Sequence, residues 1–124
     1  MPLILYIDDN RNMRENGTEI LELEGYRVLT ADDGKQGVDL ARTRNPDLIL
    51  CDVIMPMQDG YETIKQLKSD PELSQIPFVF VTASAEKSEM SKGLELGAVA
   101  YIRKPFDGEE LLETVKRNLP INRQ

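Results

Sequence analysis

The chain has 124 residues, of which 40% are hydrophobic and 30% are charged, and its net charge is −7 at pH 7. This composition is typical of a folded globular protein, and the length suits one domain, which we expect to span residues 1–124. The negative charge argues against direct binding to nucleic acid or to an anionic membrane.

Two residue counts narrow the chemistry further. Histidine is absent, which excludes histidine acid–base catalysis, histidine metal ligands and a phosphohistidine carrier. The single cysteine, Cys51, excludes an intramolecular disulfide, so nothing indicates an oxidising compartment. No apolar run reaches membrane-spanning length, and the first is too short for a signal peptide, so we expect a cytoplasmic protein.

Short apolar runs alternate with helical patterns along the chain. Most runs are continuously apolar, which is typical of parallel strands covered on both faces. The predicted strands are Leu3–Ile7, Arg27–Ala31, Leu48–Cys51, Phe78–Thr82 and Ala100–Arg103.

Capping residues mark the ends of several intervening helices. Asp33 predicts the start of a helix that runs to about Arg44, and Asp107 predicts a helix over about 108–119, because each has Gln or Glu three residues later. Two glycines stand where a left-handed residue would end a helix, namely Gly25 and Gly97.

The alternation of strand and helix predicts an α/β fold with a parallel sheet and right-handed crossovers. Five such units of this size indicate a flavodoxin-like, doubly wound (βα)5 sandwich with the strand order 2-1-3-4-5. Such folds bind ligands at the carboxyl ends of their strands.

Carboxylates follow two of the predicted strands. Asp8 and Asp9 follow the first strand and Asp52 follows the third, which is its neighbour in this strand order. Two like charges about 4 Å apart repel by on the order of 4 kcal/mol at an effective dielectric constant of 20, so three carboxylates need a cation. An all-oxygen site without histidine or cysteine favours Mg²⁺ or Mn²⁺.

Two further strand ends add a hydroxyl and an ammonium group. Thr82 closes the fourth strand and Lys104 follows the fifth. A carboxylate nucleophile, a divalent cation, a lysine and a hydroxyl together indicate phosphoryl transfer. We therefore expect the metal and Lys104 to neutralise Asp52, which would be the reacting group.

Four segments at the strand ends carry a family resemblance: IDDN at 7–10, CDVIMP at 51–56 with DG at 59–60, VTA at 81–83, and GAVAYIRKPF at 97–106. They resemble the motifs of response-regulator receiver domains of two-component signalling, in particular the chemotaxis-regulator-like ones. The resemblance extends over essentially the whole chain, and the order of the motifs makes it specific.

The resemblance implies a role for each matching site residue. Asp52 would be the phosphoacceptor, taking a phosphoryl group from a kinase phosphohistidine to form an aspartyl phosphate. Asp9, Asp52 and the backbone carbonyl of Ile54 would bind Mg²⁺, whereas Asp8 would act largely through metal-bound water. Lys104 would pair with the phosphoryl oxygens.

The resemblance also implies a switch. Thr82 would be the hydroxyl that moves toward the phosphoryl group, and Tyr101 the aromatic residue that turns inward with it, changing the face formed by helix 4, strand 5 and helix 5. The bond before Pro105 would be cis. Ile54 and Ser84 would tune the lifetime of the phosphoryl group, and since neither offers an amide or carboxylate to orient water, we expect slow autodephosphorylation.

Taken singly, several of these residues could have purely structural roles. Asp8 and Asp9 could cap the first helix, Thr82 could be an ordinary strand residue, and Tyr101 a core aromatic. Three sulfur-containing residues are expected to be packing residues: Cys51, Met55 and Met57.

Two other functions remain open. One is a Mg²⁺-dependent phosphohydrolase with an aspartyl-phosphate intermediate, although the haloacid-dehalogenase-like enzymes carry Asp-x-Asp on one strand and Asp52 is followed by Val53 and Ile54. The other is a degenerate receiver that acts only as a binding module. The leading hypothesis is a phosphorylation switch that phosphorylates and dephosphorylates itself and acts on no external substrate.

The resemblance implies partners by class only. The phosphodonor would be a histidine kinase or a phosphotransfer protein, and the output would be a downstream protein or a fused domain. A phosphorylation-dependent dimer through the helix 4, strand 5, helix 5 face is a further arrangement that receivers use. The sequence does not choose between a free-standing receiver and a piece of a longer regulator.

Overall fold

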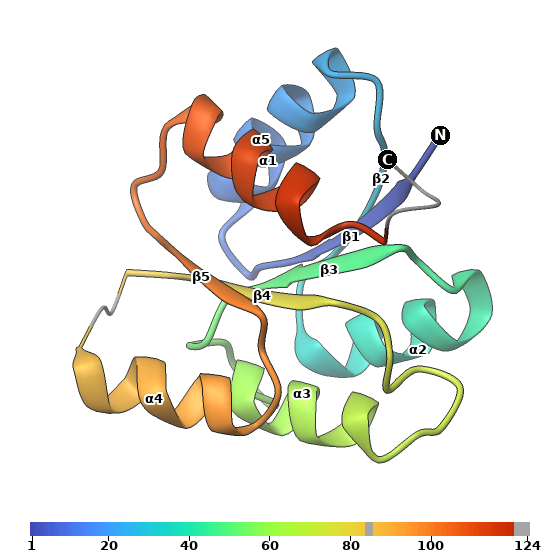
Figure 1. The fold of residues 1–124 in the computed structure, drawn as a ribbon, viewed down its shortest axis with the longest axis vertical. Coiled ribbons are helices and arrows are strands. Elements are labelled where there is room, and N and C mark those ends of the chain that lie inside the picture. Colours follow the sequence, from blue (N-terminus) through green and yellow to red (C-terminus); the bar gives the residue numbers. More distant parts are fainter. Residues whose placement is uncertain (84–85, 121–124) are drawn as a thin grey trace.

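The computed structural model describes residues 1–83 and 86–120 as a five-stranded parallel sheet covered by helices on both faces (Figure 1). The strand order is β2-β1-β3-β4-β5, as the sequence predicts. The five strands and five helices alternate along the chain: β1 Leu3–Ile7, α1 Arg11–Leu23, β2 Arg27–Ala31, α2 Gly34–Arg44, β3 Leu48–Cys51, α3 Gly60–Lys68, β4 Phe78–Thr82, α4 Lys87–Glu95, β5 Ala100–Arg103 and α5 Gly108–Asn118.

The helices form two layers. Helices α1 and α5 cover one face of the sheet, and α2, α3 and α4 cover the other (Figure 1). Because successive strand residues point to opposite faces, each central strand contributes to two separate cores. In β1, for example, Leu5 and Ile7 pack toward α2 and α3, whereas Ile4 and Tyr6 pack into the α1 and α5 layer.

The observed helix ends follow from capping side chains. Asp33 and Asp107 cap α2 and α5 by accepting hydrogen bonds from backbone N–H groups, as the sequence predicts. Helix α1 is capped by Asn10, whose side chain accepts from Met13 N at 3.1 Å, so the idea that Asp8 or Asp9 caps this helix is wrong. Gly25 and Gly97 have positive φ angles of 99° and 112°, in agreement with the expected left-handed helix ends.

The register of the sheet places the chemistry-bearing residues at one edge. Ile7 of β1 pairs with Cys51 of β3, so the residues that follow these two strands are neighbours. Asp52 N donates to Ile7 O at 2.9 Å and continues the β1–β3 pairing by one residue beyond β3. Among the described helices, none has the length and apolar character needed to cross a membrane.

Candidate phosphoryl-transfer and metal site

Three aspartates meet at the carboxyl ends of β1 and β3. One carboxylate oxygen from each of Asp8, Asp9 and Asp52 lies within 4.8 Å of the other two. Asp8 is completely buried and Asp52 is 7% exposed, whereas Asp9 is exposed at the mouth of the site. The predicted convergence of these three carboxylates is therefore present in the fold.

Lys104 pairs with two members of this acidic cluster. Its Nζ atom lies 2.7 Å from Asp8 Oδ2 and 2.9 Å from Asp52 Oδ2, and its side chain is only 12% exposed. The backbone N–H of Lys104 donates to Thr82 O at 2.8 Å, which ties the β5 end to β4. The peptide bond from Lys104 to Pro105 is cis. One ammonium group is thus shared by two buried carboxylates.

Burial sets the protonation behaviour of this group of charges. Desolvation raises the pKa of Asp52, and the hydrogen bond from Lys104 offsets this rise only in part. Desolvation works to lower the pKa of Lys104, but its hydrogen bonds to Asp8 and Asp52 outweigh that effect and leave the pKa raised. Lys104 therefore stays charged at neutral pH, and Asp52 is a carboxylate that costs free energy to ionise.

Asp8 is held from several sides by groups that the sequence analysis did not single out. Asp8 Oδ1 accepts from Asn10 N at 2.9 Å, Asp8 Oδ2 accepts from the Tyr6 hydroxyl at 3.3 Å, and Asp8 O accepts from Arg14 Nη1 at 2.8 Å. Burial, followed by the charge of Asp8, raises the pKa of Tyr6, so its phenol stays protonated. Strand periodicity could have identified Tyr6, since it lies two residues before Asp8 on the same side of β1.

The loop between β3 and α3 exposes apolar side chains beside the acidic cluster. Ile54, two residues beyond Asp52, is 69% exposed. Met55 and Cys51 are buried, as expected, but Met57 is 85% exposed, so the expectation that Met57 packs is wrong. Met57 has a φ of 69°, and this left-handed turn directs its side chain away from the core that holds Met55.

Thr82 and Tyr101 lie on the strands next to the acidic cluster. Thr82 is the last residue of β4, 2% exposed, and pairs with Arg103 of β5. The Tyr101 ring packs against Phe80 with a centroid separation of 5.1 Å. The Tyr101 hydroxyl donates to Glu89 O of α4 at 2.8 Å, so this side chain ties β5 to α4. The expected lifetime residue Ser84 lies outside the described residues.

A second tyrosine, not anticipated from the sequence, contacts the same carbonyl. The Tyr61 hydroxyl, from α3, donates to Glu89 O at 3.2 Å. Lys92 Nζ lies 4.4 Å from the centroid of the Tyr61 ring, which is cation–π geometry. Helix α4 is thus held by hydroxyl groups from both α3 and β5.

The chemistry of the acidic cluster fits a hard divalent cation. The donor set is all oxygen, as Mg²⁺ requires. Three carboxylates and one ammonium group leave two negative charges uncompensated, which one divalent cation would neutralise. The exposed carboxylate of Asp9 provides the open side from which such an ion could enter.

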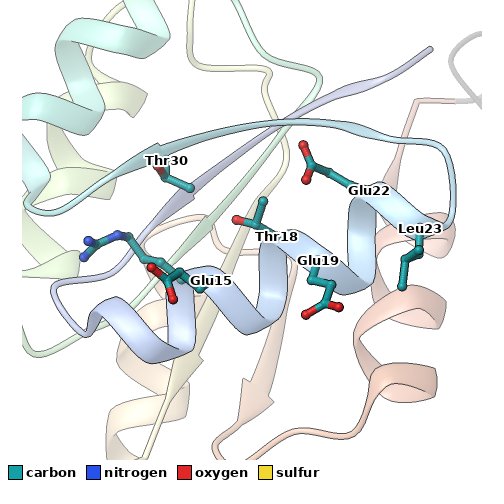
Figure 2. Close-up of a pocket in the computed structure, with 7 residues that line it drawn as sticks. Glu15, Thr18, Glu19, Glu22, Leu23 and Thr30 are labelled. Carbon is teal, nitrogen blue, oxygen red and sulfur yellow. The ribbon is translucent and has the colours of Figure 1, made fainter.

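A separate hollow of about 460 Å³ lies between α1 and the edge strand β2 (Figure 2). Its walls come from one face of α1 and from Thr30 of β2, and three glutamates make it acidic. Neither Lys104 nor Asp52 lines this hollow, so it lacks the groups that phosphoryl transfer would use. The lining residues are Arg14, Glu15, Thr18, Glu19, Glu22, Leu23 and Thr30.

Comparison with known proteins agrees with the fold and identifies the family. The model of the response regulator receiver domain family matches residues 4–116. The protein PilH of Pseudomonas aeruginosa is 39% identical over 115 residues, which are 93% of this chain and 95% of PilH. The transcriptional regulatory protein CpxR of Escherichia coli is 39% identical over 116 residues, and these are 94% of this chain but 48% of CpxR.

A solved structure of a related protein has the same fold. The chemotaxis protein CheY4 of Vibrio cholerae superimposes with a TM-score of 0.92 at 31% identity, covering 96% of this chain and 99% of CheY4. The chain belongs to the response regulator receiver domain family, whose members act as phosphorylation switches in two-component signal transduction. It spans nearly all of PilH and about half of CpxR.

Proposed function

We propose that Asp52 is the phosphoacceptor of this receiver and that its phosphorylation requires Mg²⁺. One observation carries the proposal, namely that the Lys104 ammonium lies within 2.9 Å of Asp8 and Asp52, two members of the cluster of three carboxylates. Asp9, Asp52 and the Ile54 backbone carbonyl would bind the metal, and Asp8 would act through its water ligands. Bound Mg²⁺ would supply positive charge to the phosphoryl oxygens.

The reaction we propose is a direct displacement on phosphorus. A carboxylate oxygen of Asp52 attacks the phosphorus of a phosphohistidine, the phosphorus–nitrogen bond breaks, and the imidazole that leaves takes up a proton from solvent. Lys104 is already 2.9 Å from Asp52, so it can turn from the carboxylate to a new phosphoryl oxygen by a small side-chain movement. Positioning and charge neutralisation, rather than acid–base chemistry, are then the protein's contribution.

The response to phosphorylation would pass through Thr82 and Tyr101. We propose that the Thr82 hydroxyl turns toward the phosphoryl group and that Tyr101 reports this change to α4. The hydrogen bond from Tyr101 to Glu89 O supports the proposal, because any movement of the ring makes or breaks a direct link between β5 and α4. The face formed by α4, β5 and α5 would then change for a partner.

The biological setting is proposed by class. We infer one receiver domain over residues 1–124, working in the cytoplasm, with a histidine kinase or phosphotransfer protein as donor. It would catalyse only its own phosphorylation and dephosphorylation. The output would be a separate protein, a fused domain or a phosphorylation-dependent dimer, and direct binding of nucleic acid or membrane is not expected from a net charge of −7.

The test is intact-mass analysis after incubation with acetyl phosphate and Mg²⁺. We expect one phosphoryl adduct on the wild type and none on Asp52→Asn or in the presence of a chelator. The matched control is Asp39→Asn, an exposed aspartate on α2, which should be phosphorylated like the wild type. An adduct that persists on Asp52→Asn or without divalent cations would contradict the proposal.

A further inference from the structure

Tyr6 is a buried tyrosine whose hydroxyl reaches the acidic cluster from inside the fold. It lies in β1, is fully buried, and packs in the core layer under α1 and α5. Its hydroxyl donates to Asp8 Oδ2 at 3.3 Å. A phenol buried among aliphatic side chains needs a hydrogen-bond partner, and here that partner is a carboxylate of the candidate metal site.

A glycine in α1 allows the Tyr6 ring to pack closely against this helix. Gly17 of α1 lies directly over it, and a Cβ atom at position 17 would overlap Tyr6 Cε2 and lie 3.0 Å from Cδ2. Glycine is among the least favourable residues in a helix interior, so its presence in the middle of α1 needs a reason. The close approach of the Tyr6 ring supplies that reason. An aliphatic residue at position 6 could fill the core without so close an approach to α1.

The hydrogen bond from Tyr6 differs from the other side-chain contact to the Asp8 carboxylate. Lys104 also donates to Asp8 Oδ2, at 2.7 Å, but it serves Asp52 as well and would turn toward a phosphoryl group. Among the described residues, Tyr6 is the side-chain donor to the Asp8 carboxylate that does not also contact Asp52. Because its ring is buried in the core, its hydroxyl would stay at Asp8 if Lys104 turned toward a phosphoryl group.

We propose that Tyr6 is a positioning residue, whose hydroxyl holds the Asp8 carboxylate in the orientation that the water ligands of the divalent cation require. The inference rests on the metal site of the proposed function. Groups that hydrogen-bond to metal-site carboxylates fix their direction, and removing one lowers metal affinity by about 10- to 100-fold. Because the bond from Tyr6 is long for a hydroxyl donor, the expected loss is at the lower end, about tenfold.

The direct test is calorimetric titration of Mg²⁺ into the wild type and into Tyr6→Phe. The substitution removes one oxygen and keeps the ring that fills the core. We expect the Kd for Mg²⁺ to rise about tenfold, and the Mg²⁺ concentration for half-maximal phosphorylation by acetyl phosphate to rise by the same factor. The control Tyr26→Phe, in a half-buried tyrosine immediately before β2, should leave the Kd unchanged.

A second pair of variants separates metal affinity from stability. Gly17→Ala should lower the thermal unfolding temperature of the metal-free protein, because the new methyl group overlaps the Tyr6 ring. Adding Tyr6→Leu removes the overlap and should recover much of that loss. The Mg²⁺ affinity of this double variant should nevertheless stay as weak as that of Tyr6→Phe, because the hydroxyl is still absent.

The outcomes distinguish this inference from the proposed function. If Tyr6→Phe binds Mg²⁺ as tightly as the wild type does, or if affinity follows unfolding temperature across the variants, the role given to Tyr6 is wrong and the metal site stands. If the wild type itself binds no Mg²⁺, both proposals are wrong. Asp9→Asn completes the set, since it should weaken Mg²⁺ binding whatever the role of Tyr6.

Discussion

The Nζ atom of Lys104 lies 2.9 Å from Asp52 Oδ2, although 52 positions separate the two residues in the chain. The same Nζ atom lies 2.7 Å from Asp8 Oδ2, so two buried carboxylates share one ammonium group. This sharing leaves the cluster with excess negative charge and makes both carboxylates dependent on Lys104.

Loss of the shared ammonium should destabilise the metal-free protein strongly. Lys104→Gln leaves Asp8 and Asp52 buried without a cation, and breaking a buried pair in this way typically costs about 3 kcal/mol or more. Urea unfolding in the presence of a chelator measures the loss. The matched control is Lys116→Gln, whose pair with Glu24 is exposed and should contribute less than about 1 kcal/mol. Equal losses in the two variants would contradict the account.

Loss of the Asp52 charge should have the opposite effect. Asp52→Asn leaves Lys104 paired with Asp8 and removes a carboxylate that is unfavourably buried, so we expect a gain of about 1 kcal/mol in metal-free protein at neutral pH. Unfolding curves of both proteins with chelator present measure the difference. A variant less stable than the wild type at neutral pH would show that burial does not make the ionised Asp52 carboxylate unfavourable.

The same pair of proteins gives a pH dependence with a defined sign. Because the pKa of Asp52 is raised in the fold, mainly by burial, the native state holds this proton more tightly than the unfolded chain does. Ionisation therefore costs stability as pH rises above the usual carboxyl pKa of about 4. The advantage of Asp52→Asn should shrink as pH falls from neutrality toward that value. An advantage that grows on acidification would contradict the direction of the shift.

The position of Tyr101 depends on a glycine in α4. A Cβ atom on Gly93 would overlap the Tyr101 hydroxyl and lie 2.8 Å from its Cζ atom. Gly93→Ala should therefore expel the ring, break its hydrogen bond to Glu89 O and lower stability by about 1–2 kcal/mol. Nitration by tetranitromethane with peptide mapping should show faster modification of Tyr101. Ser91→Ala, at an exposed position of α4, is the control, and equal nitration rates would exclude this arrangement.

Dephosphorylation should be slow and should respond to position 54. Ile54 is exposed close to Asp52 in sequence and offers no group to orient an attacking water. Ile54→Asn adds an amide that can do so and should shorten the phosphoryl lifetime several-fold, measured from the decay of the mass adduct after the donor is removed. Ile54→Leu should leave the lifetime unchanged. A wild-type lifetime of seconds, or equal decay in both variants, would contradict the expectation.

The sequence predicts the five strands with their observed bounds. The signal is clearest for β1, β3 and β4, because each of these central strands is buried on both faces and reads as a mainly apolar run. It also predicts the meeting of Asp8, Asp9 and Asp52, because the strand order brings the ends of β1 and β3 together. Those features depend on topology and periodicity, which leave a clear pattern in one sequence.

The remaining features depend on side-chain directions that no local pattern specifies. Met57 resembles its buried neighbour Met55 in type, and only the left-handed turn at position 57 directs it outward. The two hydroxyl groups that meet at Glu89 O come from α3 and β5, and their shared carbonyl lies in α4. Such a contact requires the packing of three elements, so sequence reasoning on each element alone could not find it.

The most direct test of the central claim locates the phosphoryl group in the chain. Protein incubated with acetyl phosphate and Mg²⁺ would be treated with borohydride, which reduces an aspartyl phosphate to homoserine, and the peptides would be mapped by mass spectrometry. The account predicts homoserine at position 52 alone, and none without Mg²⁺. Homoserine at Asp8 or Asp9, or no reduced aspartate in phosphorylated protein, would contradict the assignment of Asp52 as the acceptor.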